Sequence, residues 1–284
     1  IVVGIAGEFE RHAARQERAE ALARGAGQVH VNRVVRQALM AVTLGDLSRE
    51  HRARGAVDVA DLGLDPDRCA AVESGLQFTA HSVGDGAVHT LLDAYAEVNK
   101  TLPIRATRPC ITHSNFMSLE AVEQAAKLGV VLDIQPAWLN LDGKTLLAQF
   151  GYDRLRYFQP LQSLFKAGVT VGGGSDHMQR IGSMTSVNPY NPFLGMQTAI
   201  MRIGRNRAEP LHSEEALTRE QAIRFYTSNN ARLMFMEKLT GSLEPGKRAD
   251  FIVIDRDLLT CAAETIRETK CLATYLDGRK VYPR

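Results

Sequence analysis

The stretch Gln77-Phe78-Thr79-Ala80-His81-Ser82-Val83-Gly84-Asp85 contains the pattern that decides the fold. A short apolar run ends at a histidine, and from Asp85 onward apolar residues recur at helical spacing. The inward face of that helix is expected to carry Val88, Leu91, Leu92 and Tyr95. A strand followed by an amphipathic helix is the unit from which parallel sheets are built.

The same unit recurs further along the chain. Strands are expected at 109–112, 130–134 and 169–172, and helices after Ser118 and at 161–165, with a longer loop through Pro136, Trp138 and Tyr152 between them. This alternation implies βαβ units and a parallel sheet, either doubly wound or closed as a TIM barrel. No GxGxxG follows the first strand, which argues against dinucleotide binding.

The C-terminal part changes from helices to strands. Helices are expected at 193–203 and 218–236, the second with a capping box formed by Thr218 and Gln221. Strands follow at 250–255, 271–275 and 280–282, and Asp277-Gly278 between the last two is a hairpin signal. We therefore predict a small β subdomain after the α/β part.

The N-terminal part has a different composition. Residues 9–56 are rich in Arg, Ala and Glu, and no lysine occurs before Lys100. A basic helix can contact nucleic acid or a membrane, but a solvated helix face is the simpler interpretation. The net charge of +2 gives no reason to expect a nucleic-acid partner, and the absence of a run of 18 apolar residues predicts no membrane span.

The four cysteines form no C-x-x-C pair. Their spacing resembles neither a zinc knuckle nor a disulfide framework, so we expect reduced thiols and a cytoplasmic location. The apolar run at residues 1–7 is too short for a signal peptide.

Three residues that can bind a metal stand at the carboxyl ends of predicted strands: His81, His113 and Asp176. Ligands and catalysis gather at that edge of a parallel sheet. One such histidine would more simply be a hydrogen-bonded structural residue, but three equivalent positions favour a shared site. The 32 residues from His81 to His113 fit one βα unit, and the 63 from His113 to Asp176 fit two. If the strands are numbers 5 to 8 of a barrel, the three residues come from strands 5, 6 and 8.

Two imidazoles and one carboxylate suit a divalent metal, with Zn²⁺ the first choice, as one ion or two. Such an ion lowers the pKa of its bound water to roughly 7. Asp176 could then take a proton from that water and return it to a leaving nitrogen. These parts predict a hydrolase with a small amide-type substrate.

Several segments resemble one family, the metal-dependent amidohydrolase superfamily, and within it the branch called amidohydrolase family 3, which contains N-substituted formamide deformylase and exoenzyme-regulatory-type proteins. His81-Ser82-Val83-Gly84-Asp85 resembles its strand-5 histidine motif, Thr112-His113-Ser114 its strand-6 histidine and Gly174-Ser175-Asp176 its strand-8 aspartate. The most specific match is the stretch from Gly241 to Asp255, which resembles the exit from the barrel into a composite β subdomain. The segment 226–232 resembles the helix that precedes it.

This resemblance implies a partial (β/α)₈ barrel, strands 5–8, with a small C-terminal β subdomain. It implies hydrolysis of amide or other non-peptide C–N bonds, with His81 and His113 as metal ligands and Asp176 as ligand and proton shuttle. The expected division is an atypical segment at 1–70, the C-terminal half of the barrel at 71–236 and the β subdomain at 237–284.

The family pattern is incomplete in this chain. Family members carry a His-x-His pair on strand 1 and often a carboxylated lysine on strand 4, and neither occurs here, with His30 only a faint echo. The alternative is therefore a catalytically inactive remnant that lacks the ligands of strands 1–4. Strand edges left open would need cover from a second copy or from a missing N-terminal half.

Several other side chains near these positions have two interpretations each. His177 could face substrate or solvent. The pocket-shaping candidates Trp138, Tyr152 and Arg156 are more simply loop packing. His89 is expected to be solvated, and Asp85 either orients His81 or begins its helix.

Overall fold

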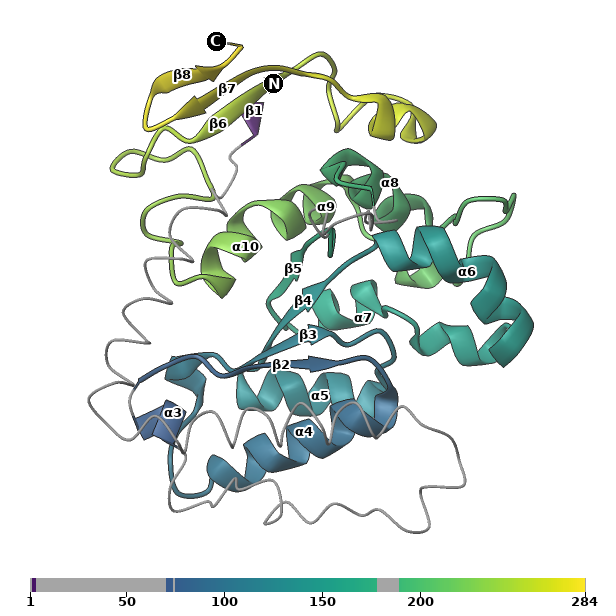
Figure 1. Cartoon of the computed structure of the whole chain (residues 1–284), viewed down its shortest axis with the longest axis vertical. Helices are drawn as coiled ribbons and strands as arrows, with labels where there is room; N and C mark the ends of the chain where they lie inside the picture. Colours follow the sequence, from purple (N-terminus) through teal and green to yellow (C-terminus); the bar gives the residue numbers. More distant parts are fainter. Residues whose placement is uncertain (1, 4–69, 74, 178–188, 284) are drawn as a thin grey trace, which may run out of the picture. The chain divides into compact units, whose positions relative to one another are not determined.

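The computed structural model describes residues 2–3, 70–73, 75–177 and 189–283 (Figure 1). The chain divides into two compact units, residues 7–131 and residues 1–6 with 132–284. The Arg-rich segment at 9–56, with His30, lies outside the described residues.

The described part of the first unit consists of two βα units. Its elements are α3 (Ala70–Glu73), β2 (Thr79–Ser82), α4 (Asp85–Val98), η4 (Arg105–Thr107), β3 (Cys110–His113) and α5 (Leu119–Leu128). Strands β2 and β3 are parallel, with Thr79 opposite Cys110 and Ser82 opposite His113. The predicted strand–helix alternation is therefore confirmed here.

The two helices of this unit bury the faces that the sequence predicts. Val88, Leu91, Leu92 and Tyr95 of α4 are buried, as are Ala121, Ala125 and Leu128 of α5. The Ser118 hydroxyl caps α5 by accepting a hydrogen bond from the Ala121 N–H at 3.2 Å. His89 is not simply solvated as predicted, because its Nε2 lies 2.9 Å from Ser118 Oγ. That contact joins the two helices.

The second unit continues with strands β4 (Val131–Ile134) and β5 (Val171–Gly173), which are parallel, with Leu132 opposite Val171. Its other elements before the C-terminal sheet are α6 (Ala137–Phe150), η5 (Asp153–Tyr157), α7 (Leu161–Lys166), α8 (Pro192–Met201), η6 (Ser213–Glu215), α9 (Arg219–Tyr226) and α10 (Ser228–Leu233). The α/β class with parallel strands is confirmed, and the assignment to barrel strands 5–8 stays a prediction. No helix among the described residues has both the length and the apolar character needed to span a bilayer.

Two helical predictions were wrong in detail. The loop predicted through Pro136 and Trp138 is the helix α6, which begins after Pro136. Leucines at several positions around this helix and a glycine within it, Gly143, hid its period. The single helix predicted at 218–236 is two helices, because Thr227 at φ −127° and ψ −93° interrupts it.

The outer edge of β5 is capped by side chains. Thr170 O accepts a hydrogen bond from Leu132 N of β4, so the carbonyls of Val171 and Gly173 point to the other side of the strand. There Asn229 Nδ2 donates to Val171 O at 2.8 Å and Asn230 Nδ2 donates to Gly173 O at 3.0 Å. A Cβ at Gly172 would lie 2.2 Å from Asn230 Oδ1, so only glycine allows this approach.

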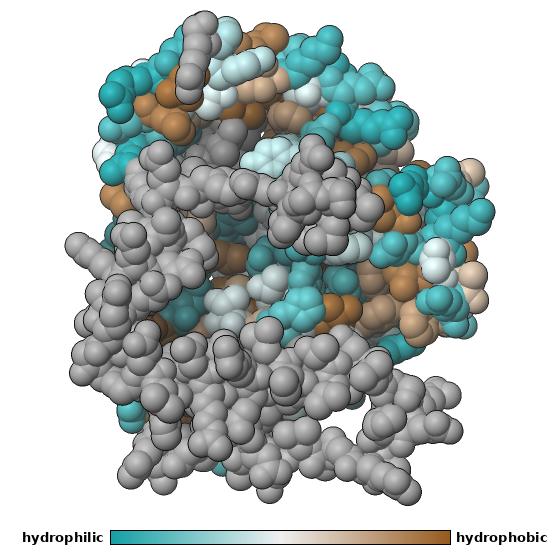
Figure 2. Space-filling model, in the orientation of Figure 1, coloured by the Kyte–Doolittle hydropathy of each residue, from teal (hydrophilic) through white to brown (hydrophobic). Residues whose placement is uncertain are grey.

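The strands predicted in the C-terminal part form a four-stranded antiparallel sheet with β1, in the order β1-β6-β7-β8, and the separate β subdomain stays a prediction. The strands are β1 (Val2–Val3), β6 (Phe251–Ile254), β7 (Cys271–Leu276) and β8 (Arg279–Tyr282). Asp277 and Gly278, both at positive φ, form the predicted hairpin turn. Figure 2 shows hydrophobic patches among hydrophilic residues over this sheet, where Leu272, Leu276 and Val281 are exposed.

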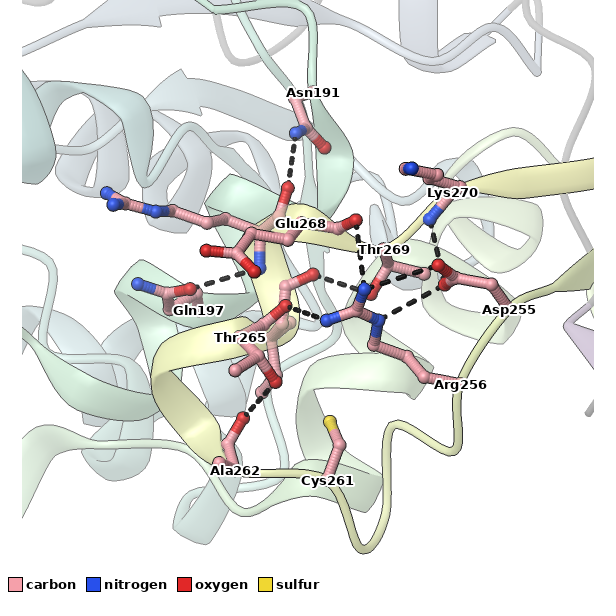
Figure 3. Close-up of polar contacts among 12 residues, drawn as sticks. Asn191, Gln197, Asp255, Arg256, Cys261, Ala262, Thr265, Glu268, Thr269 and Lys270 are labelled. Carbon is pink, nitrogen blue, oxygen red and sulfur yellow. Dashed lines mark hydrogen bonds and ion pairs between the residues drawn. The ribbon is translucent and has the colours of Figure 1, made fainter.

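A polar cluster joins this sheet to α8 through the helix η7 (Ala263–Glu268). Asn191 Nδ2 donates to Arg267 O at 2.9 Å, and Gln197 Oε1 accepts from Arg267 N at 3.0 Å. Figure 3 shows Arg256 beside them, bonded to Asp255 and to Thr265 O. These bonds satisfy backbone groups of η7 at Thr265 and Arg267.

The capping box of α9 supplies a first prediction. Thr218 Oγ1 accepts from Gln221 N at 3.2 Å, and Gln221 Oε1 accepts from Thr218 N at 2.8 Å. Thr218→Ala is expected to reduce the free energy of unfolding by about 1 kcal/mol, because the Gln221 N–H loses the hydroxyl that accepts its hydrogen bond. Thermal unfolding should show the loss, whereas Thr145→Ala on the exposed face of α6 should leave the midpoint unchanged or raise it. Equal effects of the two substitutions would contradict the role of the box.

Candidate metal and acid–base site

The two predicted histidine ligands lie together. His81 is in β2 and is exposed, and His113 is the last residue of β3 and is buried. Their ring centroids are 4.4 Å apart, with an angle of 73° between the ring planes. The sequence therefore predicted correctly that these two strand ends place their imidazoles side by side.

The backbone of His113 explains how this contact arises. The register places His81 opposite Thr112, and Ser82 opposite His113. Regular strands alternate their side chains, so Thr112 would be expected beside His81. His113 has φ 77° and Ser114 has φ 45°, and both have left the extended conformation. Two consecutive left-handed residues without glycine are uncommon and cluster at functional sites.

Two serines accompany the histidines. Ser82 and Ser114 are fully buried, and Ser114 N donates to Ser82 O at 2.7 Å. Within the part of the chain that the structure describes, their hydroxyl oxygens have no hydrogen-bond partner. Buried polar atoms without partners are rare in folded proteins. Sequence reasoning missed them, although the repeated His-Ser dipeptide at the two strand ends was a usable signal.

Asp176 lies in the second unit, three residues after the end of β5. It is exposed and has φ 51°, a left-handed conformation. Just before it, Gly174 N donates to Ile134 O at 3.0 Å, and just after it, His177 N donates to Ser175 Oγ at 3.2 Å. Its place at the carboxyl end of a parallel strand is as predicted, and its role as a ligand stays a prediction.

The chemistry of the histidine pair fits a borderline divalent ion. Imidazole nitrogens bind Zn²⁺ at roughly 2.0–2.1 Å, and rings this close can share one ion. Within residues 2–3, 70–73, 75–177 and 189–283, no group of three or more His, Cys, Asp or Glu side chains could hold a metal ion. As ligands, the two imidazoles would leave further coordination positions of such an ion to be filled.

Three other residues singled out from the sequence lie in the second unit. Trp138 is in α6 and Arg156 is in η5. The Tyr152 ring stacks on the ring of His212, with centroids 4.1 Å apart. Loop packing is therefore the observed role of Tyr152.

His212 itself is buried and anchors this loop. Its Nδ1 lies 2.9 Å from Glu214 Oε1 and its Nε2 lies 2.7 Å from Tyr152 O. The hydrogen bond from His212 is the main cause that holds the pKa of Glu214 below its usual value. The charge of Arg156 lowers that pKa further.

This contact gives a pH prediction. Because the pKa of Glu214 is lower in the folded chain, its stabilising effect is complete above the ordinary value of 4.5 and is lost as the pH falls through the lowered pKa. Glu214→Gln should therefore be less stable than the parent near neutral pH, with the difference disappearing in acid. Unfolding midpoints measured from pH 7 down to pH 3 check this. A difference that stays constant over that range would assign the effect to packing.

Arg202 is the most deeply buried charged residue outside the predicted site. Its guanidinium donates to the carbonyls of Leu211, Gln159 and Phe158 at 2.6, 2.9 and 2.9 Å. Burial lowers its pKa to about 10, against the opposing charge of Glu215. Sequence reasoning missed this residue, and an arginine directly after the apolar helix α8 was its only signal.

Parallel strands that end in an imidazole pair, followed by an antiparallel sheet, define an α/β protein with a candidate metal site at its strand ends. The family model described as the amidohydrolase family matches residues 66–282, and the chain belongs to that family.

The relatives agree with this assignment. YtcJ of Bacillus subtilis is 27% identical over 216 residues, which are 75% of this chain and 39% of YtcJ. N-substituted formamide deformylase of Arthrobacter pascens is 32% identical over 75% of this chain and 38% of its own length. Among solved structures, a metal-dependent hydrolase from Pyrococcus furiosus matches with a TM-score of 0.53 and 26% identity, over 67% of this chain and 36% of that one. The chain thus spans less than two fifths of the length of these relatives.

Proposed function

We propose that this chain forms the metal-binding and acid–base part of a hydrolase that acts on amide or other non-peptide C–N bonds. The observation that carries the proposal is the His81–His113 pair, with 4.4 Å between ring centroids at the carboxyl ends of parallel strands. Membership of the amidohydrolase family supports it. So do the names of two relatives, a formamide deformylase and a metal-dependent hydrolase.

In this proposal His81 and His113 hold a divalent ion, with Zn²⁺ the expected metal and one ion or two in the complete site. The ion, when bound, supplies Lewis acidity and makes water a nucleophile at neutral pH. Asp176 takes the proton of the attacking water on its carboxylate and returns it to the leaving nitrogen. The exposed carboxylate at a strand end suits a group that exchanges protons with substrate.

The proposed substrate is a small amide, with N-substituted formamides as the first compounds to test. A second copy or an N-terminal half is the proposed partner, because two imidazoles leave ligand positions to be filled. A cytoplasmic location belongs to the same proposal, and its support is that Cys110, Cys261 and Cys271 are all free thiols.

A second candidate is a chain that folds without chemistry. It is favoured by the lack, among the described residues, of a group of three or more side chains that could hold a metal ion. Metal analysis after equilibration with Zn²⁺, followed by an assay with an N-substituted formamide, separates the two. Stoichiometric zinc and metal-dependent formate release support the hydrolase. The absence of both zinc binding and formate release supports the inactive form.

A further inference from the structure

Two polar side chains lie together at the end of strand β4: Asp133 within the strand and Gln135 directly after it. They alternate with Leu132 and Ile134, which are fully buried. Gln135 is itself only 3% exposed. A buried amide costs free energy unless it is hydrogen-bonded, so its partners show what holds it in place.

Gln135 is held by hydrogen bonds at its side-chain nitrogen and at its backbone carbonyl. Its Nε2 donates to Asp133 Oδ1 at 3.0 Å and to Asp133 O at 3.1 Å. Its backbone carbonyl accepts a hydrogen bond from Gln159 Nε2 at 2.9 Å. The Gln135 amide therefore holds the Asp133 carboxylate against β4, and Gln159 holds the backbone of Gln135.

This pair lies against the backbone of Gly174. A Cβ built on Gly174 would be 3.3 Å from Asp133 Oδ1 and 3.6 Å from both Cγ and Nε2 of Gln135. Gly174 N also donates to Ile134 O at 3.0 Å, where β4 and β5 end. Gly174 is thus tied to the end of β4 by a backbone hydrogen bond, and the side chains of Asp133 and Gln135 line the space beside its Cα.

Two residues later, Asp176 has φ 51°. A left-handed non-glycine residue persists when its surroundings fix the chain on either side. We infer that Asp133 and Gln135 are positioning residues for Asp176, acting through the backbone of Gly174. The functional importance of this inference rests on the proposed function, because Asp176 is the residue proposed to transfer protons.

The test is Gln135→Leu, which keeps the size of the side chain and removes the amide. Its matched control is Gln124→Leu, because Gln124 Nε2 makes the same kind of bond to Asp93 Oδ1, at 2.9 Å, on the exposed surface. Backbone ¹⁵N relaxation by NMR reports the order of Asp176 in each variant without any metal. We expect the order parameter of Asp176 in Gln135→Leu to fall from near 0.85 to below about 0.6, and to stay unchanged in Gln124→Leu.

A second pair of variants keeps the test decisive if Gln135→Leu does not fold. Asp133→Asn keeps an oxygen that accepts from Gln135 Nε2, and Asp133→Ala removes it. The Asn variant should retain the order of Asp176 and the Ala variant should lose it. Unchanged relaxation of Asp176 in both Gln135→Leu and Asp133→Ala overturns the inference.

Metal binding separates this inference from the proposed function. With Co²⁺ as probe, the parent chain should show a visible d–d spectrum, and Gln135→Leu should bind Co²⁺ roughly 10-fold more weakly, as for other residues that orient a ligand. A parent chain that binds no Co²⁺ while Gln135→Leu still loosens Asp176 would refute the proposed metal site and leave the positioning role standing.

Discussion

Replacing His113 with Asn is expected to weaken Zn²⁺ binding by at least about 100-fold with little change in stability. Loss of a residue that only orients a ligand weakens metal affinity by roughly 10–100-fold. Loss of a ligand itself should weaken it by at least that much. Asn is the right replacement because it tolerates a positive φ, and His113 has φ 77°. A carboxamide oxygen is also a poor substitute for an imidazole nitrogen toward Zn²⁺.

Competition with a chromophoric chelator measures the affinities, and thermal unfolding of the metal-free chains measures stability. The matched control is His89→Asn, a histidine of the same unit that contacts Ser118 instead of another histidine. Its zinc affinity should equal that of the parent. If His113→Asn binds zinc as tightly as the parent, the histidine pair is not the metal site.

Replacing Arg202 with Met is expected to reduce the free energy of unfolding by about 3–5 kcal/mol, the range found when one partner of a buried charged contact is removed. Three carbonyls, those of Leu211, Gln159 and Phe158, would lose their donor inside the protein. The buried Glu215 would lose its nearby positive charge. Met fills a similar space and bears the same left-handed backbone, at φ 53°, so the comparison isolates the guanidinium.

Urea unfolding of the two chains gives the difference directly. Arg279→Met, at an exposed position of the edge strand β8, is the control and should change stability by no more than about 0.5 kcal/mol. A loss below about 1 kcal/mol for Arg202→Met would mean that water replaces the guanidinium at these carbonyls.

The sequence was most informative where one local rule decided the structure. Apolar runs that end at His81 and His113 gave the strands, and Thr218 with Gln221 gave the start of α9. It was least informative where packing decides. No local signal marks the break at Thr227, which separates α9 from α10, or the helix α6 with leucines on several faces.

The site divides in the same way. Residue type and spacing were enough to bring the imidazoles of His81 and His113 together. The left-handed turn at His113 and Ser114 was not predictable, since neither residue requires a positive φ. Nor was the support of Gly174 by Asp133 and Gln135, because it depends on the registration of β4 against β5. Backbone departures of this kind arise from tertiary contacts and leave no pattern in the sequence.

The amides of Asn229 and Asn230 have a consequence for how another polypeptide could anneal to β5. Among the described residues β5 pairs only with β4, and on its other side two acceptors are already occupied. An incoming strand must replace the two asparagine amides one after the other as donors to these carbonyls, beginning at Val171 or Gly173. Non-specific edge-to-edge association of copies through β5 is therefore slower. A segment whose N–H groups match the register of these two carbonyls can still pair with the strand.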